Sequence, residues 1–141
     1  MVKRPKWLDE GEVRRARREA WKIVKESLRG ERTDSLAAAI IELYRDVPRR
    51  SWIVRAVTRL LLGTVDRVTR RTWRVYGVPA LGDWYAWYVV SLEGGKYVCS
   101  CFSTRWGHVR RKRICTHIAA VILRRRQRLI EEYLSSEPST P

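Results

Sequence analysis

The three cysteines of this 141-residue chain lie in two short motifs that together offer four metal ligands. Cys99 and Cys101 are one residue apart, and after a spacer of thirteen residues Cys115 and His117 are again one residue apart. Neighbouring thiolates repel one another unless a cation lies between them, and a disulfide between residues i and i+2 would be badly strained. Three thiolates and one imidazole suit a closed tetrahedral zinc site. The spacing therefore predicts Zn²⁺ bound by these four residues.

The same residues are open to other interpretations. A catalytic zinc keeps an open coordination position, whereas four protein donors leave none, and no glutamate is placed as a general base. We therefore expect a structural ion and no enzyme activity. Three alternatives stay open: a nucleophilic cysteine beside a histidine, cysteines buried without a metal, and His108 as the fourth ligand in place of His117.

Positive charge fills the spacer between the two motifs. It holds five basic residues, no acidic residue and one tryptophan: Arg105, Trp106, Arg110, Arg111, Lys112 and Arg113. A loop tied at both ends by a metal is shaped before its ligand arrives, which reduces the cost of ordering it on binding. The spacer is therefore interpreted as a preorganised loop that grips phosphates. Its tryptophan either packs within the protein or stacks on a base.

The charge of the whole chain also favours an anionic partner. Thirty Lys and Arg residues face fifteen Asp and Glu residues, for a net charge of +15, and such an excess is typical of proteins that bind a polyanion. We expect a nucleic acid, DNA or RNA, as the partner. Two further basic sets belong to this prediction: Arg124, Arg126 and Arg128 near the C-terminus, and Arg14, Arg18, Lys22, Lys25 and Arg29 near the N-terminus. The second set is equally compatible with an ordinary solvated helix face.

The elements that must position these residues predict an α+β protein. Apolar side chains recur at helical spacing over residues 9–29, 34–47 and 51–62, which indicates about three N-terminal helices. From residue 64 the chain is rich in β-branched and aromatic residues, and three antiparallel strands are expected at 68–78, 83–92 and 96–102. The last strand would place both Cys99 and Cys101 on one face. An apolar helix follows from Ile118. Arg125 interrupts its apolar stripe, so the helix is expected to leave the core at about that residue.

The aromatic residues of the expected sheet form a second group of interest. Alternation along the strands should divide them between two faces, one in the core and one exposed: Trp73, Trp84, Tyr85, Trp87 and Tyr88. An exposed set would either stack on single-stranded bases or form a protein interface.

A family resemblance follows from these motifs. The order of strands, Cys-x-Cys, spacer, Cys-x-His and apolar helix, carried by VCSCFSTRWGHVRRKRICTHIAAVIL, resembles a SWIM-type zinc finger over roughly residues 68–125. The resemblance implies a ββα zinc module that binds DNA or proteins, with Cys99, Cys101, Cys115 and His117 as its ligands. Two features depart from the family: Phe102 stands where a proline is frequent, and the spacer is unusually basic. Residues 1–63 have no counterpart in this family.

Three regions are therefore expected: a basic helical region at 1–63, a SWIM-type zinc-finger domain at 64–134 and a flexible tail at 135–141. The leading functional prediction is a zinc-stabilised protein that grips the backbone of a nucleic acid. The alternatives are an adaptor subunit that docks a protein in a recombination or repair complex, and a ribosome-associated RNA-binding protein. No small-molecule substrate is indicated.

The expected location is the cytoplasm, in association with the nucleoid or the ribosome. No apolar run is long enough to cross a membrane, and the N-terminus lacks the features of a signal peptide. The chain contains no Asn and one Gln, a depletion of thermolabile residues that favours a thermophilic source.

Overall fold

The computed structural model describes residues 8–103 and 114–136 and consists of helices packed on one antiparallel sheet. Three helices come first: α1 (Glu10–Leu28), α2 (Ser35–Asp46) and α3 (Arg50–Leu61). Four strands follow: β1 (Val65–Thr69), β2 (Thr72–Tyr76), β3 (Trp87–Glu93) and β4 (Lys96–Cys99), with short 3₁₀ turns η2 (Pro79–Leu81) and η3 (Ser100–Ser103). Helix α5 (Thr116–Ser136) ends the described chain. The predicted α+β class and the three N-terminal helices are confirmed.

The first two helices begin where short acidic side chains cap them. The carboxylate of Asp9 accepts hydrogen bonds from the backbone N–H groups of Gly11 and Glu12, and that of Asp34 accepts one from Ala37. Such caps satisfy N–H groups that have no partner within the helix. Each helix then buries one apolar face, for example through Ile23 and Val24 of α1. The basic side chains of α1 are thereby left on its outer surface.

The sheet has the order β1-β2-β3-β4, with all neighbours antiparallel. The prediction of three strands is wrong, because the chain turns at Arg70 and Arg71 and divides the expected first strand into a hairpin of β1 and β2. The second turn, Gly94 and Gly95, lies where the sequence predicted it. Both glycines have positive φ angles of 56° and 81°, which suit a two-residue hairpin.

The last strand also differs from the prediction. β4 ends at Cys99, and Cys101 lies in the following turn η3 rather than on the strand. Cys99 and Cys101 are therefore close together for a reason other than the predicted one, which was that both lie on the same face of a strand. The tight 3₁₀ turn brings the second cysteine back towards the first.

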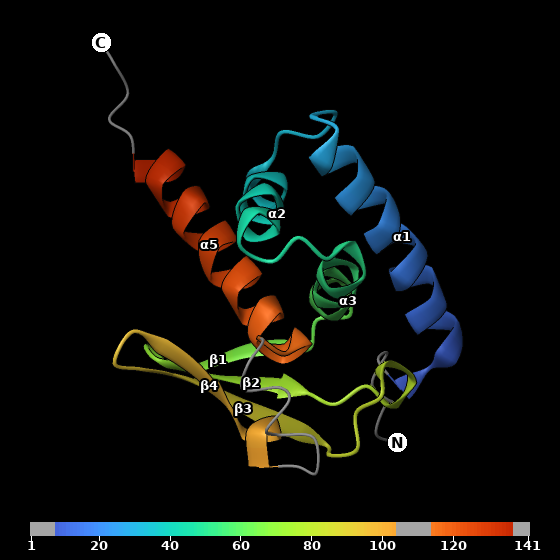
Figure 1. Ribbon diagram of the computed structural model, residues 1–141, viewed down its shortest axis with the longest axis vertical. Helices are drawn as coiled ribbons and strands as arrows, with labels where there is room; N and C mark the ends of the chain where they lie inside the picture. The colour runs from blue at the N-terminus through green and yellow to red at the C-terminus, as the bar shows by residue number, and fades with distance from the viewer. Residues whose placement is uncertain (1–7, 104–113, 137–141) are drawn as a thin grey trace.

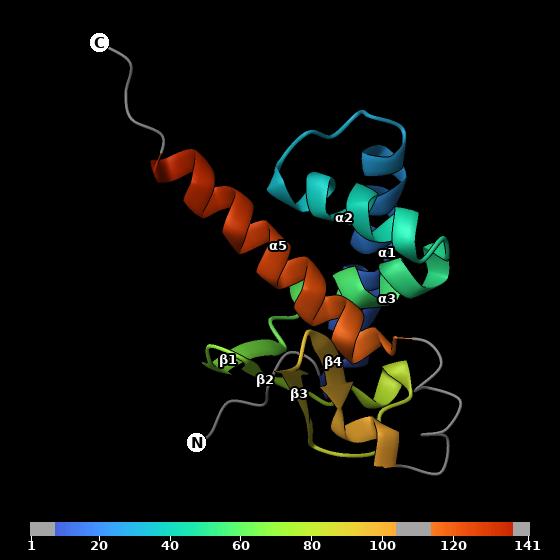
Figure 2. The same cartoon turned by 60° about the vertical axis from the view of Figure 1, so that its left-hand side comes forward.

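Helices α1, α2, α3 and α5 all lie on one side of the sheet, as Figures 1 and 2 show from two directions. One cluster of buried residues joins both layers and includes Val24, Ile40, Val57, Val90 and Ile118. Residues before and after position 63 thus share one core. Within the described residues, none of the helices combines the length and the apolar character needed to cross a membrane.

The buried part of α5 covers its first two turns. His117 to Leu123 are buried, and the residues beyond them are partly or fully exposed. The helix therefore rests on the sheet with its N-terminal half and leaves it with its C-terminal half (Figure 1). It continues to Ser136, while residues 137–141 of the predicted tail lie outside the described residues.

Candidate metal centre

The four predicted ligands come together at the point where β4, η3 and α5 meet. The ligand atoms of Cys99, Cys101, Cys115 and His117 all lie within 4.8 Å of one another, and all four residues are buried. Cys99 ends β4, Cys101 follows in η3, Cys115 immediately precedes α5 and His117 lies in its first turn. The arrangement brings residues from two ends of a thirteen-residue spacer into one cluster.

Backbone N–H groups point at two of the sulfur atoms. Ile118 donates from its backbone nitrogen to the Sγ of Cys115 over 3.4 Å, and Cys101 donates in the same way to the Sγ of Cys99 over 3.5 Å. Cys115 precedes α5, so its sulfur lies at the positive end of the helix dipole. Both features direct partial positive charge towards the sulfur atoms.

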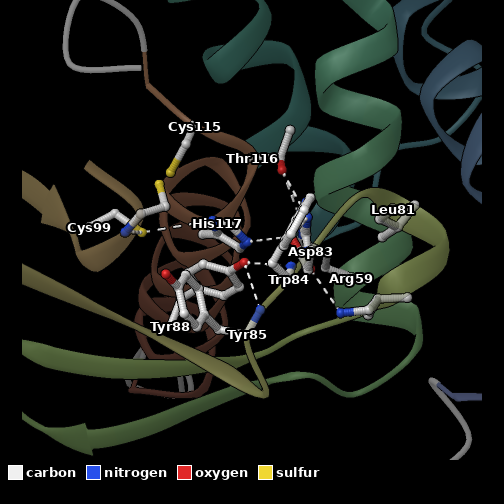
Figure 3. A network of polar contacts seen from close by, with 12 residues as sticks. Arg59, Leu81, Asp83, Trp84, Tyr85, Tyr88, Cys99, Cys115, Thr116 and His117 are labelled. Atoms are coloured by element: carbon white, nitrogen blue, oxygen red, sulfur yellow. Dashed lines mark hydrogen bonds and ion pairs between the residues drawn. The ribbon is translucent and has the colours of Figure 1, made fainter. Parts of the chain in front are cut away.

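The ring of His117 is held in one orientation. Its Nδ1 lies 3.7 Å from the Sγ of Cys99, and its Nε2 lies 2.9 Å from Oδ1 of Asp83. Since a carboxylate only accepts, Nε2 carries the proton and Nδ1 faces the sulfurs. The ring of Tyr88 stacks on the imidazole, with centroids 4.0 Å apart and planes at 22°. Figure 3 shows the imidazole between the cysteines and Asp83.

Asp83 is itself held by a buried arginine from the helical layer. Arg59 of α3 donates from Nη1 to Oδ2 over 2.6 Å and from Nη2 to Oδ1 over 3.1 Å. The side chains of Arg59 and Asp83 are only 1% and 5% exposed. The backbone nitrogen of Val78 also donates to Asp83, over 2.8 Å, and Arg59 donates to the hydroxyl of Thr116. The network thus connects α3, the loop before β3 and the start of α5 (Figure 3).

Neither Arg59 nor Asp83 was identified from the sequence. One signal was present for Arg59, because it interrupts the buried face of α3, between Ala56 and Leu60. A cation in such a position needs a buried partner. Asp83 lies in a loop, and only the fold brings it to that cation.

The thiols of Cys99 and Cys101 influence one another's ionisation. Hydrogen bonds from the thiols of Cys115 and Cys99 lower the pKa of Cys101. Hydrogen bonds with Cys101 and Cys115, together with burial, raise the pKa of Cys99. The first thiolate is therefore stabilised by its neighbours, and it opposes the ionisation of the next. A metal ion would remove that opposition.

His117 and its partner Asp83 favour opposite charges when no metal is bound. Burial disfavours both charged forms. Even so, hydrogen bonds with His117 and Arg59 hold the pKa of Asp83 well below its usual range. The hydrogen bonds of His117 with Asp83, Cys101 and Cys115 raise its pKa to about 9 when no metal is bound. A metal at Nδ1 would displace the proton from that nitrogen, so metal binding releases protons.

The geometry fits a tetrahedral metal. Zinc with bonds of about 2.0–2.3 Å holds its donors roughly 3.5–3.8 Å apart, and the distance of 3.7 Å between Cys99 Sγ and His117 Nδ1 agrees with this. The whole set, within 4.8 Å, needs only small side-chain movements to reach that geometry. A carboxylate on the second nitrogen of a histidine ligand is the usual support in metal sites. The Cys₃His group is thus suited to hold a metal ion.

The predicted nucleic-acid contacts are placed in three different ways. The six spacer residues, Arg105 to Arg113, and the alternative ligand His108 lie outside the described residues. The five basic residues predicted near the N-terminus are exposed: Arg14, Arg18, Lys22 and Lys25 of α1, and Arg29 at its C-cap. On α5, Arg124 and Arg128 line a groove against the sheet, whereas Arg126 lies within 3.7 Å of Glu42 and 3.5 Å of Asp46 in α2. The three α5 arginines therefore do not form one surface.

The predicted division of the aromatic residues is confirmed within the sheet, where Trp73 and Tyr88 are buried and Trp87 is exposed. It fails for Trp84 and Tyr85, because the strand expected at 83–92 begins only at Trp87; these two residues precede it and are both exposed, Trp84 at 94%. The exposed residues follow Asp83 directly in the chain and lead into β3.

The Cys₃His geometry is compatible with a zinc finger, whereas the resemblance to the SWIM type rests on the sequence motif alone. No family model, curated protein or solved structure matches this chain.

Proposed function

We propose that this chain is a zinc-stabilised protein that binds nucleic acid chiefly through the phosphate backbone. The observation that carries the proposal is the net charge of +15 on a chain of 141 residues. So large an excess costs self-repulsion, and a polyanionic partner relieves it. The SWIM-like order of motifs supports the same class of partner.

Zinc is the metal that the donor set favours. Three thiolates and one imidazole are soft to intermediate ligands, and zinc accepts them in a tetrahedral arrangement. Asp83 holds His117 with Nδ1 towards the sulfurs, so the fourth donor is oriented in advance. Four protein donors leave no coordination position for a substrate. The proposed role of the ion is therefore structural: it joins the end of β4 to the start of α5.

The metal would also serve binding. Cys101 and Cys115 are the two ends of the basic spacer, and their sulfurs lie within one cluster. An ion at that cluster closes the spacer into a loop, which limits the conformations that five basic residues must give up on binding. In this proposal the metal ion holds the ends of the spacer together, and the basic residues of the spacer contact the nucleic acid.

Two measurements on the purified full chain test the proposal. Elemental analysis should find about one zinc per chain. Labelled single- and double-stranded DNA and RNA should bind with a steep salt dependence: about five phosphate contacts predict a loss on the order of 500-fold in affinity between 50 and 200 mM salt. Absence of binding at low salt, or an affinity that salt hardly changes, would contradict the proposal.

A second candidate is an adaptor that docks a protein in a recombination or repair complex. The exposed aromatic group Trp84, Tyr85 and Trp87 favours it, because exposed aromatic side chains are enriched at protein interfaces. A complex with a recombinase that persists at about 1 M salt, where the screening length is about 3 Å, and that Trp84→Ala weakens would support this candidate. Retention of nucleic-acid binding by the same variant would separate the two functions.

A further inference from the structure

A groove of about 1140 Å³ separates the C-terminal half of α5 from the turns of the sheet. It is distinct from the metal centre, which lies at the opposite end of β4. Figure 1 shows α5 rising away from the sheet above the β1–β2 and β3–β4 turns. Buried Trp73 lines it, together with Leu92 of β3 and Leu129 of α5. The groove therefore has one wall from the sheet and one from α5, and apolar side chains contribute to its lining.

Both walls carry arginine. Six arginines line the groove, three from the β1–β2 hairpin and three from α5: Arg67, Arg70, Arg71, Arg124, Arg125 and Arg128. The carboxylates that line it are Asp66 and Glu132, and Asp66 already pairs with Arg74 at 3.2 Å. The groove is therefore strongly positive, and its positive charge faces inward from two sides.

Two of the arginines are held in place by the protein. Arg67 donates to the carbonyl oxygens of Thr69 and Arg70 over 3.1 and 3.0 Å, and its guanidinium lies 5.8 Å from the ring centroid of Trp73. Arg125 donates to the hydroxyl of Tyr97 over 3.1 Å. These contacts fix the hairpin tip and the helix face against the sheet, so the walls are formed before a ligand binds.

The other four arginines are available to a ligand. Among the described residues, no carboxylate lies within ion-pair distance of Arg70, Arg71, Arg124 or Arg128. Burial and the neighbouring charge of Arg128 lower the pKa of Arg124, although Glu131 opposes this. Like charges held together in this way are stabilised by an anion between them.

We propose that this groove is a binding site, additional to the basic spacer, for the phosphodiester backbone of a nucleic-acid strand, with Arg70, Arg71, Arg124 and Arg128 contacting phosphates. This inference rests on the proposed function and assigns it a surface. A guanidinium presents paired N–H donors that match two oxygens of a phosphate. Donors on two facing walls suit a ligand with anionic groups along its length. The groove volume exceeds the roughly 300–1,000 Å³ of common small-molecule sites.

The edge of the sheet argues against an acidic peptide as the ligand. β1 is an edge strand beside the groove, and a peptide would bind there by adding a strand. The register of β1 shifts between Arg67 and Thr69, and the side chain of Arg67 occupies the carbonyl oxygens of Thr69 and Arg70. An interrupted edge of this kind resists strand addition.

The test compares two double variants of the full, zinc-loaded chain. Arg70→Ala/Arg71→Ala removes the hairpin tip of the groove, and Arg45→Ala/Arg50→Ala removes the same charge from exposed positions on α2 and α3. A phosphate contact contributes about eightfold at 0.1 M salt. The groove variant should therefore lose on the order of 60-fold in affinity for a labelled oligonucleotide, and its salt slope should fall by about 1.8. The control should lose less than about threefold.

A charge-preserving variant, checks of folding and a set of probes complete the test. Arg70→Lys/Arg71→Lys keeps the charge and should retain most of the affinity, while zinc content and circular dichroism confirm that each variant folds. DNA and RNA probes of equal length identify which strand the groove prefers, and poly-glutamate serves as the acidic-peptide probe.

The outcomes separate the two proposals. If the wild-type chain binds oligonucleotides but both alanine variants lose affinity equally, the groove assignment is wrong and the proposed function stands. If the wild-type chain binds no oligonucleotide, both are wrong. Poly-glutamate that binds as tightly as the oligonucleotides, with the same dependence on Arg70 and Arg71, would also overturn the assignment to nucleic acid.

Discussion

The contact between Asp83 and Arg59 allows a sharp test of the metal centre. In Asp83→Asn the side chain keeps its shape but loses its charge, which leaves the Arg59 cation, 1% exposed, without a counter-ion. Removing one partner of a buried pair typically costs about 3–5 kcal/mol. A small domain has only about 5–15 kcal/mol of stability in total, so the variant should lose a large part of it.

The same substitution should weaken the metal site. Asp83 accepts a hydrogen bond from Nε2 of His117 over 2.9 Å and so fixes which nitrogen faces the sulfurs. Loss of such a supporting carboxylate typically costs about 10–100-fold in metal affinity. Urea denaturation of the zinc-loaded protein measures the stability, and competition with a zinc chelator measures the affinity.

Asp66→Asn is the matched control. Asp66 also pairs with an arginine, Arg74, at 3.2 Å, but the two side chains are 52% and 41% exposed. Such surface pairs contribute at most about 1 kcal/mol. A second change, Arg59→Met in the Asp83→Asn background, should restore part of the lost stability, because it removes the unpaired cation. If Asp83→Asn cost no more than Asp66→Asn and left the zinc affinity unchanged, the reasoning would be refuted.

Three further predictions concern the same region. Gly77→Ala should destabilise the protein by about 1–3 kcal/mol in urea denaturation, since the new Cβ would lie 1.9 Å from the carbonyl oxygen of Tyr85; an unchanged midpoint would contradict this. Cys115→Ser, or a strong chelator, should release the zinc and unfold the sheet and α5, because structural zinc contributes on the order of 10 kcal/mol; native circular dichroism without metal would argue against it. Acidification from about pH 7 to about pH 4 should release zinc as protons compete for the thiolates and His117. Asp83, whose pKa is depressed, stabilises the fold above its ordinary value of 3.8 and loses that contribution only at lower pH, so zinc release that required pH below about 3 would be inconsistent with this order.

The features that depend on the spacing of nearby residues were predicted from the sequence. Helical spacing located the three N-terminal helices, and the Gly94–Gly95 pair located the turn between β3 and β4. The spacing of cysteines and histidine identified the metal cluster, because few other arrangements explain three thiols and an imidazole at such short separations. Arg125 correctly marked the point where α5 leaves the core, since the buried stretch ends at Leu123.

The features that were missed depend on tertiary contacts or lack a local signal. The turn at Arg70 and Arg71 contains no Gly, Pro, Asn or Asp, so two strands were taken for one. Its conformation is supported instead by Arg67, whose side chain donates to the carbonyl oxygens of Thr69 and Arg70. The pairing of Arg59 with Asp83 spans 24 residues of sequence and exists only because α3 packs beside the loop before β3.

The position of Cys101 and Cys115 has an evolutionary consequence. The ligand atoms of Cys101 and Cys115 lie in one cluster, so a bound metal would close the segment between them into a loop whose two ends stay together whatever its length. Doubling such a loop costs only about 0.6 kcal/mol in closure entropy. Insertions, deletions and exchanges of charge there can be tried without endangering the scaffold, which makes the segment a place where descendants of this protein can acquire new partners.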